Sequence, residues 1–351
     1  MTPQPGNSPD LINPLHDSDW DSRIARFPGA SIFHTQAWAR VLVDSYGYSP
    51  YYLRGSGNDA AAGILPMMEV NSWLTGRRGI SLPFTDECPA LHSAPDSFRT
   101  LFDSALSFAR SRRWKYYELR GTAPQDCDFP PSVSYFGHQL ALTTDTKALF
   151  ATLDSAVRRA VRKAEQENVS IEFSEELSGM RQFYALLCKT RTRHGLPPQP
   201  FRFFEQIHRH IIAAGRGRIV LARSGDTTIA GAVFFHFGRS VLYKFGASDE
   251  RFQQLRGNNL VMWRAIERYA TDGFASLDFG RTSLVNEGLR RFKLSWGTQE
   301  RPVTYLRHDR EKNTFVSSAD QASGGWHNRF FRALPGGLSR LIGAAAYKHL
   351  A

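Results

Sequence analysis

The segment Gln254–Gly297 constrains the fold of this chain more than any other stretch, because it combines several clear structural signals in one order. It reads as a turn, an amphipathic helix, a short strand, a loop and a second helix. Gly257-Asn258 supplies the turn and an N-cap, and Ala275–Phe279 alternates as a strand does. The first helix is indicated by apolar residues at spacings of three to four: Leu260, Trp263, Ile266 and Ala270.

The same segment carries a candidate site. Asp278 lies at the end of the predicted strand, and Lys293 lies on the second helix, Gly288–Trp296. A glycine turn, a polar residue at a strand end and a basic residue on the following helix make a plausible site. The alternative is a lysine that extends its charged end to solvent from a half-buried helix. Asp278 and Arg281 either form a salt-bridged strand end or help to bind the acceptor.

Three groups of residues together resemble the Fem-type branch of the GNAT acyltransferase superfamily. The first is the order of GN, DFG with a following Arg, EGL, FK and WG within Gln254–Gly297. The second is Arg158–Val169 (RRAVRKAEQENV), which is similar to the RKAE-x-x-x-V segment of that branch. The third is Phe33–Trp38 (FHTQAW), which is similar to its opening F-x-x-x-x-W. The resemblance extends over residues 20–310.

The resemblance implies an α/β (α+β) fold of two tandem GNAT-like domains, each with a mixed central sheet flanked by helices. GNAT proteins usually move an acyl group from coenzyme A to an amine, whereas Fem enzymes add amino acids from aminoacyl-tRNA to peptidoglycan precursors. It also implies that Lys293, in the FK pair, lies at the donor site near the tRNA terminus and developing negative charge. A cation stabilises an oxyanion there, so Lys293 is the first candidate for catalysis.

The pattern Gln254-x-x-Gly257-x-Asn259 resembles the GNAT pyrophosphate loop, Q/R-x-x-G-x-G/A. A turn of this kind exposes backbone N–H groups at a helix N-terminus, which suits phosphate. Together with Arg256 and Asn258 these residues form the predicted cofactor-binding set. Asn259 stands where Gly or Ala is usual, so the backbone is expected to approach phosphate less closely, and a plain helix start is the alternative.

The predicted strand Ser240–Phe245 is where a GNAT-like fold places the acyl carbonyl against backbone N–H donors. Tyr243 and Lys244 are therefore candidates for proton transfer or binding, and the alternative is that both are ordinary strand residues. Amide formation needs an amine nucleophile, an acceptor for its proton and stabilisation of an oxyanion. Direct attack fits a chain without a GxSxG elbow, an HExxH motif or a convincing Cys/His pair.

The predicted elements repeat along the chain, since Phe98–Leu119 and Leu260–Phe279 hold matching places after a strand meander. One long helix is expected to open the second half. We therefore expect the following organisation: a loose tail over 1–17, a first GNAT-like domain over 18–145, a second one with the donor site over 146–310, and a linker with a basic amphipathic helix over 311–351.

The net charge of +11 favours anionic partners, either nucleotide phosphates, RNA or an anionic membrane surface, although a basic solvated surface is the simpler explanation. The basic helix with Arg158–Lys163 favours tRNA as the donor, whereas the loop Gln254–Asn259 favours acyl-CoA. No DNA partner is expected. Residues 329–350 predict a helix that either lies on an anionic membrane or, as we prefer, packs back on the protein.

Three widely separated cysteines without a CxxC pair argue against a zinc site and a disulfide framework. They favour a reduced, cytosolic compartment. The amino terminus shows no signal peptide, and no apolar run reaches the length of about 18 residues that spans a membrane. We therefore expect a cytoplasmic protein, soluble or peripheral at the inner face of the cell membrane, without a metal cofactor.

The leading hypothesis is an N-acyltransferase acting on an amine of a cell-envelope or polysaccharide precursor, with acyl-CoA or aminoacyl-tRNA as the donor. Asp86, Glu87 and Trp38 are the candidate acceptor-binding residues of the first domain. In Fem enzymes that act on peptidoglycan a lysine follows this tryptophan by about one helical turn. Leu42 stands there, which favours a different glycan or peptide amine. The alternative is a noncatalytic adaptor that keeps the GNAT fold to bind a glycan or an envelope-assembly partner.

Overall fold

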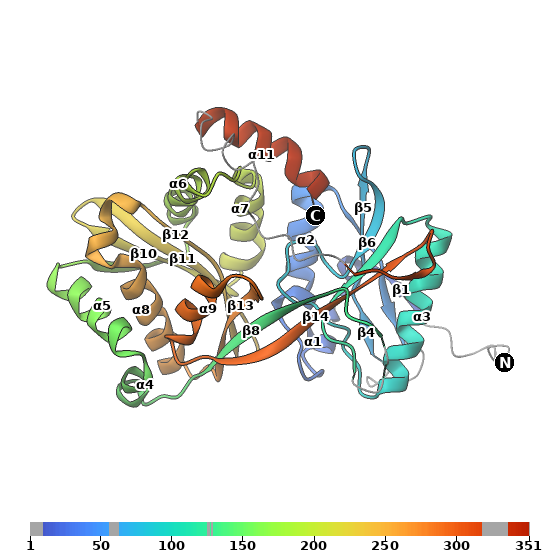
Figure 1. Cartoon of the computed structure of the whole chain (residues 1–351), viewed down its shortest axis with the longest axis horizontal. Coiled ribbons are helices and arrows are strands. Elements are labelled where there is room, and N and C mark those ends of the chain that lie inside the picture. The colour runs from blue at the N-terminus through green and yellow to red at the C-terminus, as the bar shows by residue number, and fades with distance from the viewer. Residues whose placement is uncertain (1–9, 56–62, 125–126, 128, 318–335, 351) are drawn as a thin grey trace. The chain divides into compact units, whose positions relative to one another are not determined.

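The computed structural model describes residues 10–55, 63–124, 127, 129–317 and 336–350. The chain divides into two compact units. The first unit comprises Met1–Tyr135, Pro302–Asp320 and Lys348–Ala351, and the second comprises Phe136–Arg301 and Gln321–Tyr347. The chain enters the second unit within β8 (Val133–Ala141) and returns within β14 (Gln299–Asp309) (Figure 1).

The first unit is a mixed sheet with three helices, α1 (Trp20–Ile24), α2 (Gln36–Tyr46) and α3 (Pro95–Ser111). Its sheet has the strand order β2 (Ser49–Pro50), β5 (Met68–Ser72), β6 (Gly76–Ile80), β7 (Tyr116–Arg120) and β14, with β15 (Thr314–Phe315) paired to β14. A smaller sheet joins β1 (Asp10–Ile12), β3 (Tyr52–Arg54) and β4 (Ile64–Leu65). The apolar stripe of α3 explains the core, because Phe98 and Phe102 pack with Trp114 and Tyr117.

The second unit has the strand order β8, β13 (Ser276–Ser283), β12 (Ser240–Ser248), β11 (Thr227–Phe237), β10 (Gly217–Ser224) and β9 (Ser170–Ser174). Its helices are α4 (Thr146–Thr152), α5 (Ser155–Gln166), α6 (Leu177–Arg193), α7 (Phe201–Ile207), α8 (Gly257–Thr271), α9 (Glu287–Leu294) and most of α11 (Gly336–Leu350). Helices α6 and α7 cover one face of this sheet, and α5 and α8 cover the other (Figure 1). The predicted stripe of α8 is buried in the core of this unit: Leu260, Trp263, Ile266 and Ala270.

The two units repeat one arrangement, as the sequence predicts. In each, an antiparallel strand pair leads into a long helix and then into a strand that runs parallel to the second strand of the pair. In the first unit β6 and β7 are parallel, with Gly79 opposite Tyr117; in the second, β12 and β13 are parallel, with Val241 opposite Leu277. This confirms the predicted mixed α/β fold with two GNAT-like halves.

The single long helix expected at the start of the second half is wrong. The structure has two helices, α4 and α5, separated at Leu153-Asp154, where both residues leave the helical backbone conformation. Asp154 caps α5 because its side chain accepts a hydrogen bond of 2.7 Å from the N–H of Ala156. The apolar spacing continues across the break, which explains why periodicity alone does not detect it.

The described part of the carboxyl-terminal helix packs on its own unit. In α11 the Tyr347 hydroxyl donates a 3.2 Å hydrogen bond to the carbonyl of Pro197. The part of the predicted linker and helix over 318–335 lies outside the described residues.

Candidate functional site

The first feature of the site is a separation of two strands. Strands β12 and β13 pair in parallel over three positions, 240–242 against 276–278. Beyond them β12 keeps its antiparallel pairing with β11 as far as Ser248, and β13 continues to Ser283. As far as the described residues show, the edge of β12 that faces β13 has no strand partner over 243–248. At the end of this stretch Ser248 bonds through its N–H and its carbonyl to the Thr190 hydroxyl of α6, each at 3.1 Å.

The second feature is a β-bulge in β12. Phe245 pairs with Val233, but Tyr243 pairs with the next residue, Phe234, so Lys244 is the extra residue. A bulge shifts the alternation of side chains by one position. Tyr243 and Gly246 consequently face the same side of the sheet.

Tyr243 folds back over Gly246. A Cβ atom on Gly246 would lie 1.8 Å from the Tyr243 hydroxyl oxygen, so only glycine fits beneath this ring. The ring also packs against Phe234 and Phe279, with centroid distances of 5.4 and 6.0 Å. Burial raises the pKa of Tyr243 to about 12, so the hydroxyl is protonated at neutral pH and can donate a proton or a hydrogen bond.

These two features border a pocket of about 160 Å³, which we call the β12 pocket. Small and apolar side chains form much of its lining, to which α6 contributes Thr190 and Arg193 and α8 contributes Asn258. The lining from the strands and from α8 and α9 comprises Gly231, Ala232, Tyr243, Gly246, Ala247, Ser248, Val261, Met262 and Phe292.

The predicted phosphate loop lies at this pocket. Gln254 is in the short 3-10 helix Glu250–Leu255, and Arg256 takes a left-handed backbone conformation with φ of 57°. Arg256 is the N-cap residue of α8, so Gly257 and Asn258 are in its first turn and are not the cap that the sequence suggests. Gly257 is required by packing, since a Cβ there would lie 3.0 Å from the Ile229 side chain. Asn258 alone of the five predicted loop residues is in the described pocket lining.

Lys293 points away from the described pocket lining. Its side chain is 3% exposed, and its ammonium donates hydrogen bonds of 2.8 and 2.9 Å to the carbonyls of Gly280 and Arg281. These bonds hold the bend at the end of β13. The neighbouring Phe292 is the residue of the FK pair that reaches the pocket.

His138 on β8 is a buried polar residue near Lys293 that sequence reasoning missed. It is fully buried, and neither ring nitrogen has a hydrogen-bond partner among the described residues. Burial and, to a smaller extent, the charge of Lys293 together lower the pKa of His138 to about 4, so the imidazole is neutral at pH 7. Glu300 lies 3.8 Å from its Nδ1 atom and is held by two 2.8 Å hydrogen bonds from Arg290. An isolated histidine in a strand gives no sequence signal for this cluster.

Asp278 binds its own turn and a basic residue of β14. Its carboxylate accepts a 2.6 Å hydrogen bond from the N–H of Gly280, and Arg301 lies 3.4 Å from it. Arg281 contributes its backbone carbonyl to Lys293. All of these groups stabilise the end of β13.

The predicted acceptor residues belong to the first unit. Trp38 is fully buried and packs edge-on against Phe33, with a centroid distance of 5.0 Å, so its ring is part of the core. Asp86 and Glu87 are partly exposed, and they follow a loop in which Leu82 and Phe84 have positive φ angles of 66° and 59°. Left-handed backbone at residues other than glycine is costly and often occurs at functional sites.

Two further observations apply to the described residues only. They contain no group of three or more His, Cys, Asp or Glu side chains that could hold a metal ion. None of their helices combines the length and the apolar character needed to cross a membrane.

Comparison with known proteins agrees with this geometry. Residues 153–294, which include the β12 pocket, match the model of the acetyltransferase (GNAT) domain. A search of curated proteins finds no match.

Solved structures share the fold at low sequence identity. The crystal structure of FemX has a TM-score of 0.67 at 14% identity, covering 84% of this chain and 96% of its own. L-PGS from Bacillus licheniformis has a TM-score of 0.54 at 11% identity, covering 95% and 99%. The C-terminal domain of a candidate lysylphosphatidylglycerol synthetase from Agrobacterium fabrum has a TM-score of 0.56 at 11% identity, covering 88% and 94%.

The matched domain relates residues 153–294, with the separated strands β12 and β13, to the acetyltransferases of the GNAT superfamily. The likeness to FemX is one of fold and extends over most of the chain.

Proposed function

We propose that this protein is an N-acyltransferase that transfers an acyl or aminoacyl group to an amine by direct attack, with the donor bound in the β12 pocket. The observation that carries the proposal is the convergence at one pocket of the open edge of β12, the Tyr243 hydroxyl and the first turn of α8. These supply the three things that acyl transfer needs: hydrogen-bond donors for the oxyanion, a proton donor and a phosphate-binding helix terminus.

The chemical step follows from these positions. The amine attacks the acyl carbonyl, and backbone N–H groups of β12 stabilise the oxyanion that forms. The bond from carbonyl carbon to the donor sulfur or oxygen then breaks, and the leaving group takes a proton. The Tyr243 hydroxyl borders the pocket and can give that proton, which it then regains from solvent. The proton of the amine passes to solvent.

Acyl-CoA is the donor that the pocket favours, because Asn258 places the amino-terminal turn of α8 at the lining. Aminoacyl-tRNA is the second candidate, and the charge of α5 favours it. Arg159, Arg162 and Lys163 are exposed on that helix, where they suit a phosphate backbone. We propose an amine of an envelope or glycan precursor as the acceptor, since the FemX fold is shared and a lysylphosphatidylglycerol synthetase, by its name, modifies a lipid. Asp86 and Glu87 remain the candidate acceptor residues.

The first experiment is a thermal-shift titration with coenzyme A, acetyl-CoA, long-chain acyl-CoAs and an aminoacylated minihelix ending in CCA. A ligand at 100 times its dissociation constant adds about 2.7 kcal/mol to the free energy of unfolding. A saturable shift with one donor identifies it. No shift with any of these donors contradicts the proposal.

Two variants then test the residues. Tyr243→Phe should lower kcat by roughly 10²-fold, the contribution typical of a positioned proton donor, while donor affinity stays near the wild-type value.

Lys293→Met should reduce kcat because β13 loses its two carbonyl hydrogen bonds. Arg291→Met is the matched control, since Arg291 is 80% exposed on the same helix. An unchanged kcat in Tyr243→Phe would remove Tyr243 from the mechanism.

A further inference from the structure

Exposed apolar side chains are concentrated at one place, the segment 284–294. This segment comprises the end of the loop after β13 and helix α9. Among the residues that the structure describes, nine large apolar side chains are exposed, and five of them belong to this segment: Leu284, Val285, Leu289, Phe292 and Leu294. Apolar groups gathered on the surface in this way mark a binding site more often than a solvated face. The ligand of this segment therefore has an apolar part.

Leu289 and Phe292 share one face of α9. They are three positions apart, so their side chains are neighbours along the helix. The same face continues into the core at Trp296, whose ring packs edge-on against that of Phe292 with a centroid distance of 6.3 Å. Trp296 is fully buried, whereas Phe292 is 36% and Leu289 is 38% exposed. These three side chains lead from the core to the surface, and we call them the α9 row.

The α9 row begins at the β12 pocket. Phe292 is one of the residues that line this pocket, and Leu289 extends the row beyond the lining. Leu284 and Val285 precede Asn286, the N-cap of α9, so exposed apolar side chains continue at that end of the helix. A chain that leaves the pocket past Phe292 consequently meets further apolar groups.

The basic side chains of α9 do not interrupt the row. Lys293 directs its ammonium to two backbone carbonyls of β13. Arg290 donates two 2.8 Å hydrogen bonds to Glu300. Arg291 is two positions from Leu289, which places it on a different face of the helix. The face that carries Leu289 and Phe292 is therefore apolar.

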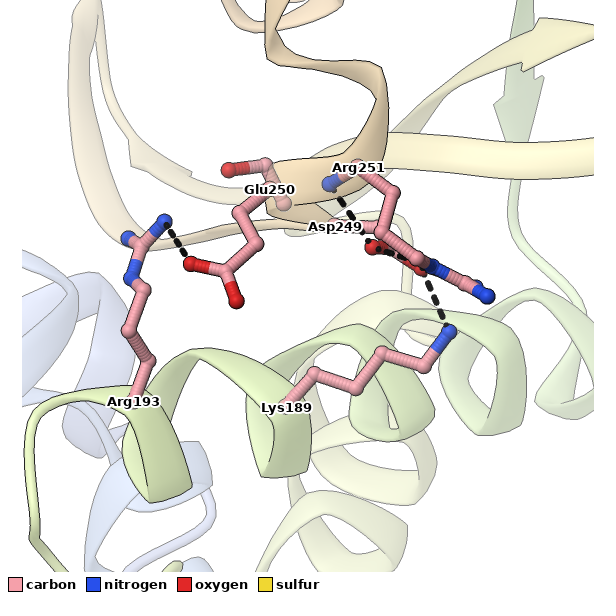
Figure 2. A pocket seen from close by; sticks show the side chains of 6 residues that line it. Lys189, Arg193, Asp249, Glu250 and Arg251 are labelled. Atoms are coloured by element: carbon pink, nitrogen blue, oxygen red, sulfur yellow. Dashed lines mark hydrogen bonds and ion pairs between the residues drawn. The ribbon is translucent and has the colours of Figure 1, made fainter. Parts of the chain in front are cut away.

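A second hollow next to the pocket is charged. It has a volume of about 200 Å³ and is lined by Lys189, Arg193, Ser248, Asp249, Glu250 and Arg251 (Figure 2), of which Arg193 and Ser248 also line the β12 pocket. Asp249 is buried there and accepts hydrogen bonds of 2.7 Å from Lys189 and 2.6 Å from Arg251. An apolar chain is not expected to enter this hollow, because it would separate these charged groups from water.

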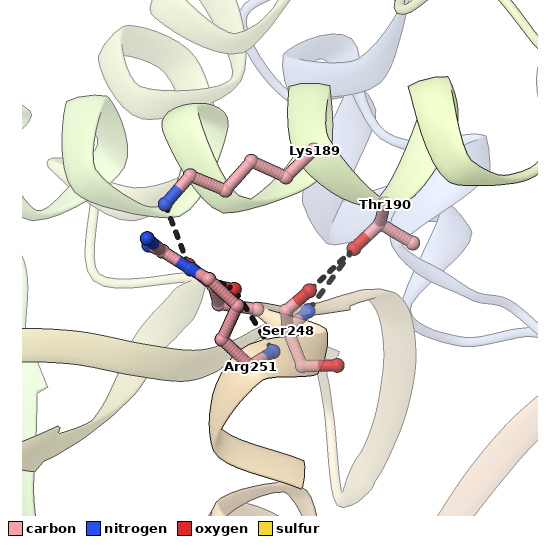
Figure 3. A network of polar contacts seen from close by, with 5 residues as sticks. Lys189, Thr190, Ser248 and Arg251 are labelled. Carbon is pink, nitrogen blue, oxygen red and sulfur yellow. Dashed lines mark hydrogen bonds and ion pairs between the residues drawn. The ribbon is translucent and has the colours of Figure 1, made fainter. Parts of the chain in front are cut away.

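Hydrogen bonds between α6 and β12 hold the polar end of the pocket in place. The Thr190 hydroxyl donates to the carbonyl of Ser248 and accepts from its N–H, each at 3.1 Å (Figure 3). Both residues line the β12 pocket. The pocket is thus polar where α6 meets β12 and apolar where the α9 row begins. A ligand that matches this distribution has a polar body and one apolar chain.

We propose that the α9 row binds the alkyl chain of the acyl donor, so that the transferred group is a medium- or long-chain fatty acyl group carried as its CoA thioester. This inference rests on the proposed function and adds the class of acyl group to it. The row is continuous with the pocket in which the donor binds, and this continuity favours the chain of the donor over a separate partner. The bond from the acyl carbon to the CoA sulfur breaks as the bond to the amine nitrogen forms; CoA leaves as the thiol, and the amine proton passes to solvent.

The test measures the affinity of acetyl-CoA, octanoyl-CoA and decanoyl-CoA by titration calorimetry, each below the concentration at which it forms micelles. Two further probes are decylamine, which carries a similar chain on an amine, and the aminoacylated minihelix. A methylene that is fully removed from water strengthens binding about fourfold. A surface row covers a chain from one side only, so we expect the wild type to bind decanoyl-CoA about ten- to a hundredfold more tightly than acetyl-CoA.

Leu289→Ser removes the outer end of the row, and Leu294→Ser is its matched control. Both leucines belong to α9 and are 38% exposed. Leu294 is five positions further on, about 140° around the helix axis. We expect Leu289→Ser to weaken decanoyl-CoA about fivefold and acetyl-CoA less than about twofold, and Leu294→Ser to match the wild type with every probe. If Leu289→Ser fails to fold, Leu289→Ala, which favours the helix, decides.

The outcomes separate this inference from the proposed function. A wild type that binds acetyl-CoA and decanoyl-CoA equally, or only the minihelix, overturns the inference and leaves the proposed function intact. An equal preference for decanoyl-CoA in the wild type and Leu289→Ser also overturns it, because the chain would then lie elsewhere, as does an equal loss in Leu294→Ser. A contribution of Leu289 that is confined to decylamine places the chain on the acceptor and overturns the assignment to the donor. A wild type that binds none of the donors contradicts both proposals.

Discussion

The contact between Tyr243 and Gly246 allows one sharp prediction. In Gly246→Ala the new Cβ would lie 1.8 Å from the Tyr243 hydroxyl oxygen and 2.9 Å from the ring carbon that bears it. The ring must move by about 1.6 Å to restore ordinary contact. It is packed against Phe234 and Phe279, so this movement disturbs the core. Overpacking of this kind costs about 1–3 kcal/mol.

The assay is urea unfolding of Gly246→Ala, Tyr243→Ala and the double variant. In the wild-type background Gly246→Ala should lower the free energy of unfolding by about 1–3 kcal/mol. In the Tyr243→Ala background the same substitution should lower it by less than about 0.5 kcal/mol, because the clashing ring is absent. Gly288→Ala is the control, since its Cβ would meet no atom closer than 3.9 Å and alanine favours the helix by about 0.5–1 kcal/mol. Equal costs of Gly246→Ala in both backgrounds would refute the reasoning.

Two further predictions concern stability. Glu118 is buried, which alone raises its pKa, but Arg120 and Arg307 outweigh burial and lower the pKa to about 2. The Glu118 carboxylate therefore stabilises the fold fully above the pKa of the unfolded state, near 4.5, and this stabilisation is lost as the pH falls toward 2. The free energy of unfolding should change by about 3 kcal/mol over this pH range in the wild type and not in Glu118→Gln. The same pH dependence in both proteins would contradict the prediction. Asp154→Ala removes the cap of α5 and should lower the free energy of unfolding by about 1 kcal/mol. Urea unfolding should show a lower midpoint with an unchanged m-value. Asp154→Asn, which can still accept the capping hydrogen bond, should keep most of the stability.

The sequence predicts much of the second unit because its signals are local. The apolar spacing of Leu260 to Ala270 places α8, and the alternation around Asp278 places β13. The repeated order of elements predicts the two GNAT-like halves.

The geometry of the site depends on contacts that are distant in sequence, and these the sequence does not show. Arg193 and Asn258 line one pocket although 65 positions separate them along the chain. Lys293 looks like an exposed cation in the sequence, but in the folded chain its ammonium bonds to the carbonyls of Gly280 and Arg281 within β13. The bulge at Lys244 cannot be predicted from the sequence either. The stretch of alternating apolar and polar residues around it is too short to show a shift of one residue.

That bulge has a consequence for how the pocket can change over time or in the laboratory. Substitutions at Ala232, Val261 or Met262 alter the volume that a donor meets and leave the backbone register untouched. Deleting Lys244 would keep the pairing of Tyr243 and Phe245 with β11 but remove the bulge, and inserting a residue into the regular part of β12 would turn the later side chains to the opposite face. The pocket therefore tolerates substitutions that change its volume step by step, but not insertions or deletions over Tyr243–Gly246. Selection experiments on donor preference should accordingly recover substitutions around this stretch and no insertions or deletions within it.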